Sequence, residues 1–230
     1  MELEQVRTRV APTSFAHERT LPVSAELADL FPEGALVRGR VLSCTGPAAT
    51  SLALALASAA MESGSWMAVV DMPTLGLDAA SELGVPLQRI VSVSSADWPA
   101  AVAAAVDGFD LVLSSVPGRG AALRRSAATM LASRVRQRGA VLLTIGATGE
   151  LACDGTLRTT GPEWEGLEAG HGRLCLRHID VRAGGRRIPV ERCRRVLLPG
   201  DHGRPEAETS SAPVDGEVAE GDPRGLVLVS

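Results

Sequence analysis

Residues 39–61 read GRVLSCTGPAATSLALALASAAM, and this stretch decides the fold class. It places a short apolar run, 41–44, before a Gly-Pro pair and an Ala/Leu-rich segment, 51–61. A short continuous apolar run is typical of a strand covered on both faces, and the Ala/Leu-rich segment is typical of a helix. The stretch therefore predicts one strand–helix unit of an α/β protein.

The same alternation continues along the chain. After a short capped helix at 24–30, strands are predicted at 41–44, 66–71, 89–93, 111–113 and 140–145, and helices at 51–61, 77–83, 98–106 and 121–138. Strands that alternate with helices imply right-handed crossovers between parallel strands. We therefore expect a mainly parallel sheet flanked by helices.

The pattern changes after residue 146. Residues 147–172 are rich in Gly and Thr and are expected to form a long loop. Residues 173–181 alternate, 183–185 suit a hairpin turn, and 188–190 with 195–198 could complete a set of C-terminal antiparallel strands. Residues 199–223 are polar, acidic and Gly/Pro-rich, so we expect them to be disordered.

Composition limits the function classes. The 230 residues are 45% hydrophobic but include only three Trp, three Phe and no Tyr, so the core must be aliphatic. Four well-separated Cys argue against a zinc site and against a disulfide framework. No apolar run approaches the length of a membrane span, and the start lacks the apolar region of a signal peptide. The sequence predicts a cytoplasmic protein with no metal and no cofactor.

Charge is unevenly distributed although the net charge is only −4. All 23 basic residues are Arg, and residues 111–149 contain six of them and no acid. Such asymmetry allows a basic face for nucleic acid or for an acidic partner, or simply a solvated helix face. The partner-binding candidates on this helix are Arg124, Arg125, Arg134 and Arg138.

Several ordered segments resemble the RecA recombinase family. Residues 39–47 resemble the RecA segment that leads into the phosphate loop, with its Arg-Gly-Arg entry, strand and Gly-Pro pair. The likeness continues through Val69-Val70-Asp71, Leu77-Asp78 and Leu83-Gly84-Val85, and residues 110–115 hold the Walker B strand position. It covers residues 22–199 and implies a RecA-like core, with 1–21 as an oligomerisation or partner-docking arm and 200–230 as an acidic flexible tail.

The residues that handle phosphate in that family are missing here. A working P-loop reads G-x-x-x-x-G-K-[ST], with the Lys on phosphate and the hydroxyl on Mg²⁺. Gly46 matches the first position, but Ser51, Leu52 and Ala53 replace the second Gly, the Lys and the hydroxyl residue. Leu52 is expected to present an apolar group to the polyanion, while Thr50 and Ser51 could still cap the following helix.

Further losses fall at independent positions. The resemblance places Ser114 where Walker B has a carboxylate, and Pro73 where the family has its catalytic Glu. The strand at 142–146 lacks the Asn-Gln pair that senses the γ-phosphate in RecA. We therefore expect a pseudo-ATPase and no enzyme activity.

The DNA-binding loops of RecA are also altered. Only five residues separate Ser115 from Ala121, so the first loop is absent. The counterpart of the second, 147–172, holds Arg158 against five acids and should repel a phosphate backbone. Direct contact with DNA stays open at this point.

A RecA-like core without ATPase residues is similar to the ImuA family, particularly its ImuA-prime branch. This resemblance implies an accessory protein of damage-induced (SOS) mutagenesis, nucleoid-associated when in complex. Its partners would be ImuB, an inactive Y-family polymerase homologue, and an error-prone DNA polymerase. The alternatives are a SulA-like inhibitor that binds the tubulin-like division protein, and a modulator of RecA filaments. A further partner-binding candidate is the apolar end formed by Leu226, Val227, Leu228 and Val229, which could add a strand to a partner's sheet or to its own.

Overall fold

The computed structural model describes residues 19–116, 123–168, 171–200 and 202–208. For residues 167, 168 and 171–175 it describes the backbone alone. Its strands are β1 (Thr20–Leu21), β2 (Leu36–Val37), β3 (Val41–Thr45), β4 (Met67–Val70), β5 (Ile90–Val93), β6 (Leu111–Ser115), β7 (Val141–Ile145), β8 (Gly155–Glu168), β9 (His171–Gly185), β10 (Ile188–Leu197) and β11 (Glu206–Ala207). Its helices are α2 (Ala25–Ala28), α3 (Ala49–Glu62), α4 (Leu77–Glu82), α5 (Trp98–Gly108) and α6 (Arg125–Arg138), with a 3-10 turn, η1 (Leu87–Arg89), before β5.

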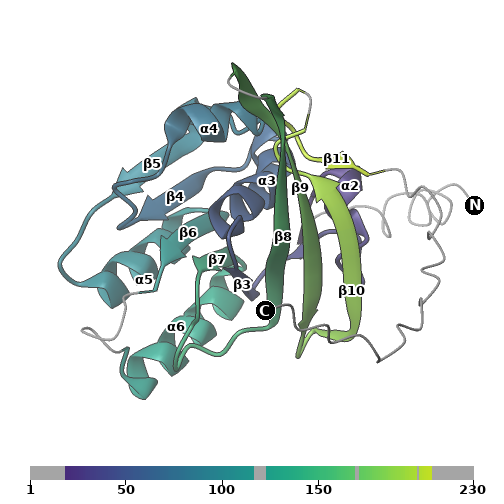
Figure 1. The fold of residues 1–230 in the computed structure, drawn as a ribbon. Helices are drawn as coiled ribbons and strands as arrows, with labels where there is room; N and C mark the ends of the chain where they lie inside the picture. The colour runs from purple at the N-terminus through teal and green to yellow at the C-terminus, as the bar shows by residue number, and fades with distance from the viewer. Residues whose placement is uncertain (1–18, 117–122, 169–170, 201, 209–230) are drawn as a thin grey trace, which may run out of the picture.

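A nine-stranded mixed sheet runs through the molecule in the order β11-β10-β9-β8-β3-β7-β6-β4-β5 (Figure 1). Five neighbouring strands are parallel to one another, in the order β3, β7, β6, β4 and β5. β8 also pairs with β3 in parallel. β8, β9, β10 and β11 pair antiparallel with one another. The predicted α/β class, with a parallel sheet flanked by helices and C-terminal antiparallel strands, is confirmed.

Helices cover both faces of the parallel half, which explains why its strands are apolar throughout. Along β4, Met67 and Val69 pack into the cluster that contains α3, while Ala68 and Val70 pack into the cluster that contains α5 and α6. All four residues of β4 are buried. Successive side chains of a strand point to opposite faces, so a strand between two helical layers must be apolar at every position.

The ends of α5 and α6 follow from local chemistry. Asp97 caps α5 by accepting a hydrogen bond from the Ala100 amide at 3.2 Å. Gly139 ends α6 with φ 72°, a left-handed conformation that glycine adopts without steric cost. The helix predicted at 121–138 begins at Arg125, and residues 117–122 lie outside the described residues.

The prediction of a long loop at 147–172 is wrong, because most of this segment forms β8. This strand pairs with β3 on one side and with β9 on the other. Two of the glycines that suggested a loop lie at the two irregularities of the β8–β9 register: Gly161 has φ 59° and Gly166 has φ 101°. Glycines at bulges leave a strand intact, and the β-branched Thr residues favour it.

The prediction of disorder throughout 199–223 is also wrong, because part of this segment packs on the rest of the fold. β11 pairs with the end of β10, and Arg204 contacts Glu62 at the end of α3, 2.6 Å between Nη2 and Oε1. The apolar end 226–229 and residues 1–18 lie outside the described residues. None of the helices in the described ranges combines the length and apolarity that crossing a bilayer requires.

Candidate functional site

The positions that the RecA resemblance singled out lie at one edge of the parallel sheet. Gly46 follows β3, Ser114 lies near the end of β6, and β7 runs between these two strands. Neighbouring strands are about 4.8 Å apart, so β3 and β6 lie roughly 10 Å apart. Ligand sites of open α/β sheets form at this carboxyl edge. The three segments thus meet where a nucleotide site would be.

The turn between β3 and α3 is closed by β8. Gly46 has φ 98°, and a Cβ there would lie 2.6 Å from Thr159 Oγ1 and closer still to the Thr159 carbonyl oxygen. The Thr159 hydroxyl accepts a hydrogen bond from the Ala48 amide and donates one to the Thr45 carbonyl, each at 3.1 Å. In a P-loop, backbone amides in this turn face phosphate oxygens. Here the Ala48 amide faces a buried threonine hydroxyl.

The helix α3 begins earlier than a P-loop allows. Its first residue is Ala49, so two of the four positions expected between the loop glycines are already helical. The N-cap is Ala48 and no side chain caps the helix, so the expectation that Thr50 and Ser51 act as caps is wrong.

The apolar residues that replace Lys and the hydroxyl residue belong to the core. Leu52 and Ala53 are fully buried, and Ser51 is half-buried. The expectation that Leu52 faces a polyanion is therefore wrong. On an α-helix that packs against the sheet, an apolar residue at this position turns inward because burial removes it from water.

Ser114, which the resemblance places at the Walker B position, is a buried hydrogen-bonding centre. Its Oγ accepts a hydrogen bond from Trp98 Nε1 at 2.7 Å and donates one to the Val70 carbonyl at 2.9 Å. Its exposed fraction is 0%. The hydroxyl thus links α5, β6 and β4, and a carboxylate in its place would be a buried charge without a cation.

The segment that follows β4 is held by its backbone and by Asp71. Asp71 has φ 51°, and its Oδ1 accepts a hydrogen bond from the Ser95 amide at 2.8 Å. This contact ties the end of β4 to the end of β5. Pro73, at the position of the family's catalytic Glu, is exposed.

Sequence reasoning missed the two residues that complete this region, Thr159 and Trp98. Thr159 lies in the segment expected to be a loop, where alternation within residues 155–160 was the available signal for a strand. Trp98 was assigned to a helix, but no periodicity reveals which hydroxyl its indole N–H will find.

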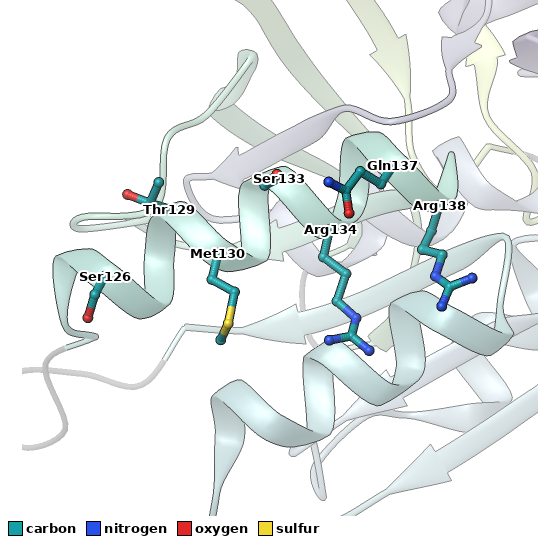
Figure 2. A pocket seen from close by; sticks show the side chains of 7 residues that line it. All are labelled: Ser126, Thr129, Met130, Ser133, Arg134, Gln137 and Arg138. Carbon is teal, nitrogen blue, oxygen red and sulfur yellow. The ribbon is translucent and has the colours of Figure 1, made fainter.

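The arginines proposed for partner binding lie on α6, and the structure pairs three of them with carboxylates. Arg125 contacts Glu150 at 2.9 Å. Arg134 and Arg138 both reach Asp107 at the end of α5, where Arg138 Nε lies 2.9 Å from Oδ1. Figure 2 shows these two side chains extending from α6 toward the neighbouring helix. Arg124 precedes the helix and is exposed.

The electrostatics of this cluster follow from Asp107. Its hydrogen bond from Arg134, with the positive charges of Arg134 and Arg138, lowers the pKa of Asp107 to about 2. The same hydrogen bond raises the pKa of Arg134. Asp107 and Arg134 are therefore both charged at neutral pH.

Cysteine and metal chemistry are both limited in the described part of the chain. Burial raises the pKa of Cys44 to about 12, so its thiol is unreactive at neutral pH. Cys153 and Cys193 are free thiols. No group of three or more His, Cys, Asp or Glu side chains within the described residues is placed to hold a metal ion.

Comparison with known proteins places the chain in a family. A family described as the MT3502 N-terminal domain matches residues 29–150, which is more than half of the chain. The uncharacterized protein Rv3395c of Mycobacterium tuberculosis is 34% identical over 146 residues, covering 62% of this chain and 68% of the relative. The matched segment 29–150 contains the strands β2 to β7 and the helices α3 to α6. The shared unit is thus the parallel half of the sheet with its two helical layers, and the chain belongs to the MT3502 N-terminal domain family.

Proposed function

We propose that this chain is a RecA-like protein without ATPase activity. In this proposal it is an accessory protein of DNA-damage-induced mutagenesis. It holds an inactive Y-family polymerase homologue and an error-prone polymerase together for translesion synthesis.

The observation that best supports a non-catalytic role is the filled carboxyl edge of the sheet. Ser114 is bonded to Trp98 and Val70, the Ala48 amide is bonded to Thr159, and Leu52 is buried in the core. At Ser114 and at the Ala48 amide, where an ATPase keeps a polar group free for metal or phosphate, the polar group is satisfied by a neutral neighbour. Freeing any of them would leave a buried polar group without a partner, which costs about 1–3 kcal/mol.

The arrangement of the strands supports the RecA-like part of the proposal. The segments matched to the P-loop, the γ-phosphate sensor and Walker B are β3, β7 and β6, which are consecutive in the sheet. The resemblance requires these segments to meet at one edge, and a different strand order would have separated them.

The mutagenesis role rests on the resemblance to the ImuA family. A chain that retains this sheet and gives up phosphate handling can still present surfaces to proteins. Its candidate surfaces are the α6 arginines and the apolar end 226–229.

A phosphate-release assay tests the non-catalytic part. The purified full chain with Mg²⁺ and ATP should release no more phosphate than a protein-free blank, with or without DNA. Turnover that is lost in Ser114→Ala but kept in the neighbouring Ser115→Ala would contradict the proposal.

Affinity purification tests the mutagenesis role. The tagged full chain, captured from DNA-damaged cells of its own source, should retain the inactive polymerase homologue and the error-prone polymerase. Recovery of the tubulin-like division protein instead would favour the SulA-like alternative, and recovery of RecA alone would favour a filament modulator.

A further inference from the structure

Three open hollows adjoin one another along one side of the molecule. The first, about 830 Å³, follows α6 and is the one drawn in Figure 2. The second, about 510 Å³, lies between the end of α6 and the two short strands β1 and β2, which pair antiparallel with each other. It shares Gln137 and Arg138 with the first. The third, about 570 Å³, continues past Arg38 toward the end of α3. We call this surface the α6 track.

Positive charge is concentrated on the track. Its lining residues include five arginines and no acid: Arg19, Arg38, Arg134, Arg136 and Arg138. Two carboxylates lie beside it, Asp107 and Asp110, and Asp110 pairs with Arg38 at 2.8 Å. Counted over these described residues alone, the five arginines exceed the two carboxylates by three charges, although the whole chain has a net charge of −4.

Two of these arginines are available to an outside anion. Arg19 and Arg136 are exposed, and neither guanidinium contacts a carboxylate within the described part of the chain. Both line the second hollow, at the end of α6. Basic side chains there also offset the partial negative charge of the helix C-terminus.

The other lining groups match phosphate chemistry. Hydroxyl and amide side chains also line the track: Ser126, Thr129, Ser133 and Gln137 on α6, with Ser63 and Ser65 just after α3. Arg, Ser, Thr and Gln side chains supply most protein contacts to nucleic-acid phosphates, and the guanidinium fork matches a phosphate in two hydrogen bonds.

The shape and composition favour a duplex over other polyanions. The 14 residues of α6 extend about 21 Å, which suits a polymer rather than a single phosphate. The lining contains no aromatic side chain on which an unpaired base could stack. Met130 is the one large apolar side chain that α6 adds to the lining, so the contacts along this helix come mainly from arginine, hydroxyl and amide groups.

We propose that the α6 track binds the phosphodiester backbone of double-stranded DNA without sequence preference. This site is separate from the carboxyl edge of the sheet, and it requires neither a RecA-like ancestry nor any polymerase partner. Contacts from three to five arginines predict that log K falls with log[salt] with a slope of about −3 to −4.5.

Fluorescence anisotropy with a labelled 20-base-pair duplex of random sequence tests the proposal on the full chain. The variant R19A/R136A removes the two lining arginines that contact no carboxylate among the described residues. The control R158A/R182A removes two exposed arginines that are paired across β8 and β9 and that line none of the three hollows. Thermal unfolding verifies that both variants are folded.

We expect the parent to bind the duplex at 50 mM salt and R19A/R136A to bind it about tenfold or more weakly. The slope of log K against log[salt] should be smaller by about 2 in this variant. The control should bind within twofold of the parent. No binding at 50 mM salt, or equal losses in both variants, would overturn the proposal. So would tighter binding to a single strand, or displacement of the duplex by a poly-glutamate peptide at a lower concentration than by unlabelled duplex.

Discussion

At the scale of single residues, neutral hydrogen bonds hold the carboxyl edge of the sheet together. Ser114 and Thr159 each serve as donor and acceptor at once, which suits a hydroxyl. A carboxylate can only accept, so it could not donate to the Val70 carbonyl as Ser114 does. The local chemistry is therefore consistent with a structural centre.

Removing the Ser114 hydroxyl tests this interpretation. In Ser114→Ala the indole N–H of Trp98 and the Val70 carbonyl lose a buried partner, so we expect a loss of about 1–3 kcal/mol in the free energy of unfolding. The measurement is urea unfolding. Ser115→Ala is the matched control because its side chain is exposed, and it should change stability by less than about 0.5 kcal/mol. Equal losses in the two variants would contradict the prediction.

The close approach of β8 to Gly46 gives a second prediction at this scale. Gly46→Ala adds both a left-handed strain and a collision with Thr159. Gly146 has φ 86° with nothing near its Cβ position, so Gly146→Ala adds strain alone. Gly46→Ala should therefore cost at least about 2 kcal/mol more than Gly146→Ala in chemical unfolding. Similar costs would show that β8 does not close this turn.

At the scale of elements, the antiparallel half is held by charged contacts across its strands. His178 on β9 contacts Glu165 of β8 at 2.6 Å and Glu208, just after β11, at 3.4 Å. Arg195 on β10 contacts Glu163 and Glu208 at 2.9 and 2.7 Å. The acids that were expected to repel DNA thus include two that pair with basic residues of the same sheet.

His178 should make the stability of this half depend on pH. Burial lowers the pKa of His178, but hydrogen bonds with Glu165 and Glu208 and their charges outweigh it, so its pKa is raised. A raised folded-state pKa gives stability that is fully present below the unfolded value of about 6.5 and is lost as pH rises through the folded value.

Thermal unfolding between pH 5.5 and 8.5 measures this effect. At low pH the parent should have a higher melting temperature than His178→Gln, and this difference should shrink as the pH rises. The control His202→Gln, at an exposed position, should show the same dependence of melting temperature on pH as the parent. A difference between parent and His178→Gln that stays constant with pH would refute this role for the imidazole.

At the scale of the whole molecule, two truncations of the segment after β10 have different expected effects. Residues 202–208 add β11 and the contact of Arg204 with Glu62, whereas 209–230 include the apolar end proposed for partner binding. A chain ending at residue 208 should keep the melting temperature of the parent and retain less polymerase partner on an affinity resin. A chain ending at 199 should also melt a few degrees lower, because β11 and its contacts are gone. Full partner capture by the chain ending at 208 would show that the apolar end does not bind partners.

Much of the parallel half could be predicted because its signals are local. Burial is indicated directly by residue type in the apolar runs at 41–44 and 111–113 and in the Ala/Leu-rich segment at 51–61. A strand that is covered on both faces must be apolar at every position, so its sequence identifies it. β8 could not be predicted in this way. Its Gly161 and Gly166 resemble turn residues, and only pairing with β3 and β9 makes them bulges.

The sequence by itself determined the alternation of strands and helices, the apolar core and the absence of Lys from residues 46–53, because each follows from residue types at fixed spacing. Only the tertiary structure decided that Thr159 fills the turn after Gly46, that Trp98 meets Ser114, and that the arginines of α6 gather with Arg19 and Arg38 on one surface. These contacts join residues far apart in the chain, and their partners are chosen by strand order and helix packing, which no local pattern encodes.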